Sequence, residues 1–194
     1  HMGFLWGRYE LLQRLPTFRE DFIPDEPPGK IEAGTVIYEN LAGMDAAVTY
    51  LSDLGASLSN GDGLPHGAAG EQHISKALLA IRTYEQSLSA ELLHVLEECG
   101  ARVYGVDNPA QLSRRVPTVC FNLQGIAPSV VTEHMARAGV GIRDGHLYAP
   151  RLMARLGLDS ESGAARVSLV HYNTVAEVHR FGNLLLDLKT SRPR

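Results

Sequence analysis

Two places in the chain carry groups suited to holding an anion. The guanidinium of Arg166 can hold a carboxylate through two parallel charge-assisted hydrogen bonds, which a lysine cannot copy. Gly34 and Thr35 offer backbone amides and a hydroxyl that can contact phosphate oxygens. Each place also has an ordinary interpretation. Arg166 could be a strand-end arginine paired with a surface acid, and Thr35 could belong to the turn before a helix.

Other reactive patterns are missing from the sequence. No Walker motif, dinucleotide fingerprint, zinc-ligand spacing or nucleophile elbow occurs. His171 and His179 lie at a strand end and on a helix face, so we do not expect them to converge on a metal. The two cysteines, Cys99 and Cys120, are typical of small buried hydrophobic residues in a reducing compartment. We therefore predict no metal site.

The bulk composition describes an ordinary globular protein. The chain has 194 residues, of which 44% are hydrophobic and 21% are charged, and its formal net charge is −4. This charge gives no field that would hold nucleic acid or an anionic membrane. No apolar run approaches the roughly 20 residues that span a bilayer. We expect a cytoplasmic protein with one sizeable core and a smaller appendage.

The second half of the sequence predicts an α+β domain. A long amphipathic helix ends at Gly100, a second helix runs from Pro128 to Ala138, and a third begins at a capping box of Thr174 and Glu177. Between them, strand patterns occupy 102–104, 118–123, 141–144 and 167–170, with a small helical patch at 150–156. A small, mainly antiparallel sheet with helices packed on one face buries these stripes.

The first half has fewer regular patterns. An aromatic, strand-like patch at Phe4–Trp6 leads into a short helix, and a proline-rich loop follows from Pro16 to Lys30. A helical stripe then ends at Gly55. Because residues 57–70 are rich in Gly, Ser, Asn, Asp and Pro, we predict a flexible linker there between residues 1–56 and a domain of residues 71–194.

Two longer segments resemble a known family. The segment 140–150 reads VGIRDGHLYAP, and 165–174 reads ARVSLVHYNT. In this order and spacing they resemble the small domain of the class V aminotransferases, the cysteine desulfurase-like group. FLWGR at 4–8 and EAGT at 32–35 resemble the end of that family's large domain, so residues 1–56 would be a remnant of it. The resemblance covers nearly the whole chain.

The resemblance implies roles for particular residues. Arg166 would bind the α-carboxylate of an amino-acid substrate. Gly34 and Thr35 would contact the phosphate of pyridoxal phosphate in the partner subunit, which implies a homodimer. Arg143, His146 and Tyr148 would line the access of the substrate. A packed loop with a surface arginine remains the alternative for these last three.

Tyr148 departs from the pattern of true cysteine desulfurases. In that group, a cysteine just after a Gly-His pair accepts sulfur as a persulfide, and here Tyr148 stands at that place, after Gly145 and His146. A phenol cannot form a persulfide. The departure argues against conventional sulfur transfer and leaves lyase, transaminase or epimerase-like chemistry open.

The lysines of the chain do not match the family's Schiff-base position. Pyridoxal phosphate requires a positioned lysine, and the chain has only Lys30, Lys76 and Lys189. We therefore expect a catalytically incomplete portion of an enzyme that binds no cofactor alone. One alternative is a stand-alone module that binds a protein partner or a small ligand. Another is a chain whose missing large domain is supplied by a partner in trans.

Overall fold

The computed structural model describes residues 2–32, 34–59 and 69–191. The chain divides into two compact units, His1–Leu78 and Leu79–Arg194, and the boundary falls within helix α3 (Ala69–Glu98). Most of the predicted linker, residues 60–68, lies outside the described residues. The division at 57–70 therefore stays a prediction.

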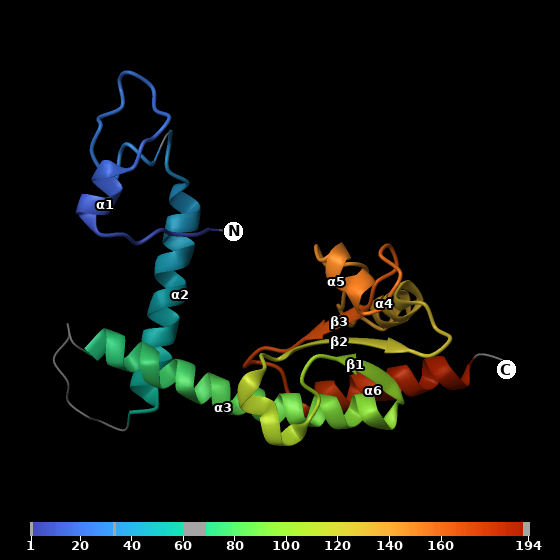
Figure 1. Cartoon of the computed structure of the whole chain (residues 1–194). Coiled ribbons are helices and arrows are strands. Elements are labelled where there is room, and N and C mark those ends of the chain that lie inside the picture. Colours follow the sequence, from blue (N-terminus) through green and yellow to red (C-terminus); the bar gives the residue numbers. More distant parts are fainter. Residues whose placement is uncertain (1, 33, 60–68, 192–194) are drawn as a thin grey trace. The chain divides into compact units, whose positions relative to one another are not determined.

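The first unit contains little regular structure apart from helices (Figure 1). It holds α1 (Tyr9–Arg14), α2 (Tyr38–Ser57) and the first turns of α3. A Cβ atom added to Gly55 would lie 1.8 Å from the backbone oxygen of His73. Glycine at this point of α2 therefore allows the two helices to approach closely.

The second unit is built on a three-stranded antiparallel sheet in the order β1-β2-β3. Its strands are β1 (Ala101–Tyr104), β2 (Thr118–Leu123) and β3 (Ala165–Ser168). In the central strand, Val119, Phe121 and Leu123 are buried while the residues between them are partly exposed. Because neighbouring side chains of a strand point to opposite faces, one face of the sheet is covered and the other is open.

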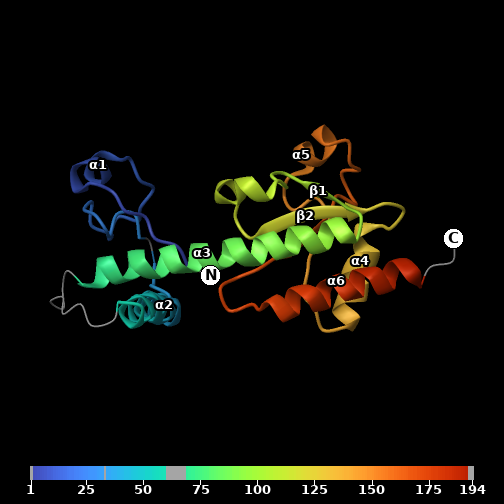
Figure 2. The same cartoon turned by 90° about the horizontal axis from the view of Figure 1, so that it is seen from below.

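Helices cover the face that carries Phe121. The second half of α3 and α6 (Val175–Thr190) lie on the same side of the sheet (Figure 2). They approach closely at Gly182, where an added Cβ would lie 2.4 Å from a methyl group of Val95. The ring of Phe121 meets that of Phe181 edge-on, with centroids 6.0 Å apart. The core is therefore formed between the sheet and these two helices.

Short elements complete the second unit. The connection from β1 to β2 contains the 3-10 helix η1 (Pro109–Arg114), and α4 (Pro128–Arg137) and α5 (Pro150–Arg155) lie between β2 and β3. Helix α4 contacts both α6 and β3, and it buries Val131 and Met135 in the core.

Most of the predicted elements are confirmed. The fold is mixed helix and strand with a small antiparallel sheet, and the Thr174–Glu177 capping box begins α6. Two predicted strands are wrong. Residues 4–6 have no regular structure, since no strand among the described residues pairs with them, and 141–144 is reduced to a single bridge at Arg143. Within the described residues, no helix is long and apolar enough to cross a membrane.

Candidate functional site

The open face of the sheet carries a row of four side chains. Tyr104 on β1 pairs with Cys120 on β2, and Cys120 pairs with Arg166 on β3. Arg143 continues the row, because its amide donates to the Arg166 carbonyl (3.1 Å) and its carbonyl accepts the Arg166 amide in return (2.6 Å). Directly paired residues project to the same face of a sheet. The row therefore places the side chains of two arginines next to each other on one face of the sheet.

Neither arginine of the row is neutralised by an acid. Arg166 is partly buried and Arg143 is exposed, and among the described residues neither forms an ion pair. The described residues thus give no support to the interpretation of Arg166 as a strand-end arginine paired with a surface acid, and its role stays a prediction. Two adjacent cations without a counter-charge favour an anionic ligand.

The loop that follows Arg143 forms the wall of a shallow cavity of about 400 Å³. Arg143, His146 and Tyr148 line it, and Asp144 and Thr132 contribute polar atoms. The Tyr148 amide donates to Nδ1 of His146 over 3.1 Å. Tyr148 has a φ of 62°, follows Leu147 at 51°, and leaves its side chain almost fully exposed. The structure thus brings together three of the four predicted substrate residues at one cavity and places the fourth, Arg166, beside Arg143.

A glycine pair holds this loop against β3. The Ala164 amide donates to the carbonyl of Gly145 over 3.1 Å, and Gly145 forms a bridge with Gly163. A Cβ atom on Gly163 would lie 2.0 Å from the Gly145 oxygen, and its φ is +54°. Glycine is therefore required at position 163, both for the close approach and for the left-handed backbone.

Cys120 lies in the row but is a poor nucleophile. Burial raises the pKa of its thiol, and the nearby Arg166 and Arg115 only partly oppose this shift. Since the thiolate is the reactive form, Cys120 stays protonated at neutral pH. It does not replace the cysteine that is missing at position 148.

Gly34 and Thr35 lie in the first unit, in an exposed turn. Gly34 has a φ of 91°. Helix α2 begins at Tyr38 with Ile37 as its N-cap, so Thr35 does not cap that helix. The turn leaves the Thr35 side chain exposed, and its role as a phosphate contact stays a prediction.

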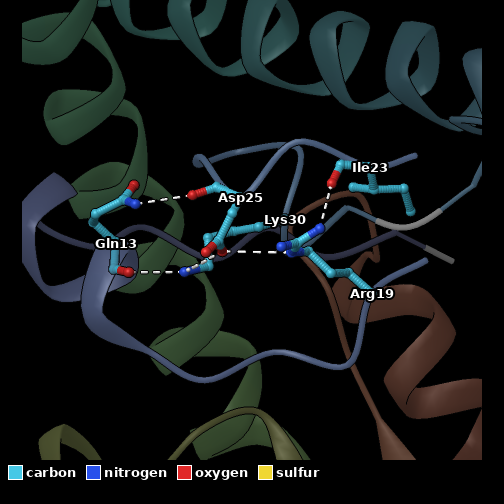
Figure 3. Close-up of polar contacts among 5 residues, drawn as sticks. All are labelled: Gln13, Arg19, Ile23, Asp25 and Lys30. Carbon is cyan, nitrogen blue, oxygen red and sulfur yellow. Dashed lines mark hydrogen bonds and ion pairs between the residues drawn. The ribbon is translucent and has the colours of Figure 1, made fainter. Parts of the chain in front are cut away.

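The three lysines make structural contacts. Lys30 is 4% exposed; its Nζ donates to the Gln13 carbonyl (2.7 Å) and lies 3.1 Å from the Asp25 carboxylate (Figure 3). Lys189 donates to the Cys99 carbonyl at the end of α3 (2.7 Å). Lys76 donates to the hydroxyl of Ser59 (3.1 Å). Each amine therefore serves the local fold.

The histidines singled out in the sequence have separate partners. His179 Nε2 lies 2.6 Å from the Glu91 carboxylate, which links α6 to α3. His171 meets the Tyr172 ring edge-on, with centroids 5.5 Å apart. Among the described residues, no group of three or more His, Cys, Asp or Glu side chains is arranged to hold a metal.

A larger concave region of about 710 Å³ lies between α3 and the η1–β2 connection. Its central arginine, Arg115, donates to the carbonyls of Val106, Val116 and Thr118. These bonds fix the connection, so this guanidinium acts as a structural clamp. We place the candidate site at Arg166 and Arg143, whose side chains make no such bonds to the backbone in the described part of the chain.

Sequence reasoning missed three residues near the candidate site. Cys120 and Asn122 lie on the open face of β2, and Asp144 lies in the loop cavity. The alternation of TVCFNL in β2 was the available signal, because it assigns Cys120 and Asn122 to the face opposite Phe121. Nothing in the local sequence pointed to Asp144.

Comparisons with known proteins agree on one family. The family model of aminotransferase class V matches residues 67–181. A probable cysteine desulfurase of Synechocystis sp. is 32% identical over 192 residues, which cover 93% of this chain and 39% of that protein. A probable cysteine desulfurase of Staphylococcus aureus is 29% identical over 202 residues, covering 97% of this chain and 41% of that protein. The chain thus spans about two fifths of these relatives.

A solved structure is similar over almost the same span. The apo cysteine desulfurase of Thermococcus onnurineus superposes with a TM-score of 0.70 at 25% identity, and the match covers 95% of this chain and 42% of that one. An aminotransferase-like protein of Gibberella zeae is 42% identical over 102 residues, covering 51% of this chain and 25% of that protein.

Proposed function

The chain belongs to the class V aminotransferase family, and on that premise we propose that it is the substrate-carboxylate-binding portion of a pyridoxal-phosphate enzyme that acts on an amino acid. The single observation that carries this proposal is the bridge between Arg143 and Arg166. It supports the proposal because it pairs Arg166 with Arg143, which lines the cavity of the 143–148 loop, and neither arginine forms an ion pair among the described residues. A carboxylate is the complementary ligand.

Arg166 takes the central role in this proposal. A guanidinium holds a carboxylate with two parallel bonds and so fixes its orientation as well as its position. Arg143 adds positive charge at the mouth, and His146 and Tyr148 bound the space for the rest of the substrate. These four residues would therefore orient an amino acid by its carboxylate end.

The fit of this chain to pyridoxal phosphate is partial. The exposed Gly34–Thr35 turn offers amides and a hydroxyl for a phosphate. The cofactor also needs an amine that can form an imine, and Lys30, Lys76 and Lys189 are held in structural hydrogen bonds. We therefore derive no catalytic step from this chain. In the complete enzyme, which would be a cytoplasmic homodimer, a lysine outside these residues would hold the cofactor.

Tyr148 narrows the proposed reaction. Its phenol cannot carry a persulfide, and the protonated Cys120 does not take over that task. We therefore favour lyase, transaminase or epimerase-like chemistry at Cα or Cβ of the amino acid over conventional sulfur transfer.

A titration followed by NMR tests carboxylate binding. In the labelled 194-residue chain, L-alanine is expected to shift the side-chain N–H resonance of Arg166, whereas L-alaninamide, which lacks the carboxylate, leaves it in place. Arg166→Lys should weaken the affinity for L-alanine by roughly tenfold or more, because hydrogen bonds to charged groups are worth about 1.5–3 kcal/mol. Arg137→Lys, at an exposed position of α4, is the matched control. Equal binding of L-alanine and L-alaninamide would refute the proposal.

Borohydride trapping tests the part played by the lysines. When the chain is incubated with pyridoxal phosphate and reduced, mass spectrometry should find no stoichiometric adduct on any lysine, because each amine is hydrogen-bonded to the fold. Stoichiometric reduction onto Lys30 would show that the chain carries its own cofactor site.

A further inference from the structure

Two buried side-chain atoms at the candidate site lack hydrogen-bond partners among the described residues. One is Nε of Arg166, which is a donor, and the other is Oδ1 of Asn122, which is an acceptor. Buried polar groups in folded proteins are nearly always paired, since an unpaired one loses its hydration without compensation. This rule calls for a partner within reach of each of the two atoms.

The sheet places these two residues within reach of each other. Cys120 is the direct partner of Arg166, and Asn122 lies two residues further along β2. Residues two apart on a strand share a face, so Asn122 and Arg166 are diagonal neighbours on the open face. At that spacing, long side chains of adjacent strands can touch. A donor without an acceptor thus lies next to an acceptor without a donor.

The amide of Asn122 is already oriented. Its Nδ2 donates to the carbonyl of Gly163 over 3.1 Å, so the oxygen is the end of the amide that remains for another contact. Gly163 is in turn the residue that lies against Gly145. Asn122 therefore connects the strand of Cys120 with the junction that holds the 143–148 loop.

We propose that Asn122 is a positioning residue for Arg166. A rotation of these side chains lets Oδ1 of Asn122 accept the Nε–H of Arg166 before any ligand binds, and the two terminal nitrogens are thereby turned toward the ligand site. This geometry leaves the outer edge of the guanidinium for the two parallel bonds that a carboxylate needs. The inference rests on the proposed function for the identity of the ligand, but the contact between the two side chains can be measured without any ligand.

One other atom in the second unit competes for the role. Nε2 of His134, on α4, is also buried and unpartnered among the described residues. It accepts a hydrogen bond in only one of the two neutral tautomers, whereas the amide oxygen of Asn122 always accepts. His134 also lies on a helix rather than on the strand beside Arg166. Asn122 is therefore the better partner, and His134→Ala is the matched control.

The test follows the Nε–H proton of Arg166 by NMR in the 194-residue chain. In the wild-type chain this proton should exchange slowly with water. Asn122→Ala should speed the exchange and weaken L-alanine binding by about fivefold or more, the effect of losing one hydrogen bond. Asn122→Asp, which keeps an acceptor oxygen, should retain slow exchange. His134→Ala should change neither quantity, and thermal unfolding of each variant monitors the fold.

The outcomes separate this inference from the proposed function. If Asn122→Ala and Asn122→Asp both leave the exchange of the Arg166 proton unchanged, or if His134→Ala alone accelerates it, the positioning role is refuted even where L-alanine binds. If Asn122→Ala accelerates exchange but the wild-type chain does not bind L-alanine, the contact is supported and the proposed function fails. Should Asn122→Ala unfold the chain, the comparison of Asn122→Asp with wild type decides.

Discussion

The two units of the chain differ in what their apolar residues do. In the second unit, Leu88, Leu92, Phe121 and Leu185 are completely buried in one core. In the first unit, large apolar side chains such as Phe18 are exposed, and among the described residues only Lys30, Gly55, Ser59 and Ala77 are buried. Since burial of apolar surface is the main driving force of folding, the second unit can stabilise itself and the first cannot do so in this way.

Several large apolar side chains of the first unit are exposed to solvent. Phe4, Leu5, Trp6, Phe18 and Phe22 are each more than 70% exposed, and exposed patches of this kind mark contacts with other polypeptide. The chain corresponds to about two fifths of its relatives. Exposed side chains of this kind are what the remnant of a large domain at 1–56 would show, and that division stays a prediction.

The largest predicted effect is on the free energy of unfolding, and it compares one phenylalanine from each unit. Phe121→Ala should lower the free energy of unfolding of the chain by about 3–5 kcal/mol, because it leaves a cavity in the core of the second unit. Phe18→Ala, at a fully exposed position, should change it by less than about 0.5 kcal/mol. Urea unfolding followed by circular dichroism measures both. Similar losses in the two variants would show that the first unit has a core of its own.

A second prediction concerns the close approach that holds the candidate loop. Gly163→Ala should cost more than about 2 kcal/mol, because alanine is strained at a φ of +54° and its Cβ would collide with the Gly145 backbone. Gly139→Ala is the control, since Gly139 has a φ of +73° but open space for a Cβ. It should cost only about 1–2 kcal/mol. Equal losses would mean that the loop moves aside at little cost.

A structural feature could be predicted from the sequence when the residues that form it are close together along the chain. The capping box of α6 joins residues three apart, and strand β2 consists of six consecutive residues. Both were predicted because neighbouring residues determine them. The bridge between Arg143 and Arg166 joins residues far apart in the chain. The sequence alone named both arginines but gave no physical reason for their pairing.

The sequence predictions failed for features that depend on contacts with residues elsewhere in the chain. Residues 4–6 have the composition of a strand, yet a strand requires a neighbour, and the described part of the chain offers them none. For Lys30, contacts elsewhere in the chain produce a burial that the local sequence does not predict. A lysine in a proline-rich loop is normally exposed, and its burial depends on Asp25 and Gln13, which no periodic pattern connects to it.

A third prediction tests whether α6 contributes to the stability of the second unit through its N-terminus. The hydroxyl of Thr174 accepts the Glu177 amide, and the Glu177 carboxylate accepts the Thr174 amide. Thr174→Ala should therefore lower the free energy of unfolding by about 1 kcal/mol. Thr190→Ala, in the last turn of the same helix, is the control and should have little effect. Equal effects from the two variants would exclude the cap as the cause.

The smallest predicted effect concerns Lys30, a buried charged residue of the first unit. Lys30, with a smaller contribution from Arg19, holds the pKa of the Asp25 carboxyl below its usual value of 3.8. A depressed pKa means that the contribution to stability is present above the unfolded pKa and is lost as the pH falls through the folded one. NMR titration of Asp25 should therefore give a midpoint below 3.8, and Lys30→Met should raise it. Because Asp25 itself is exposed, Lys30→Met should leave the unfolding of the second unit unchanged. A midpoint that stays low in Lys30→Met would assign the shift to Arg19, and a destabilised second unit would show that the two units are energetically coupled.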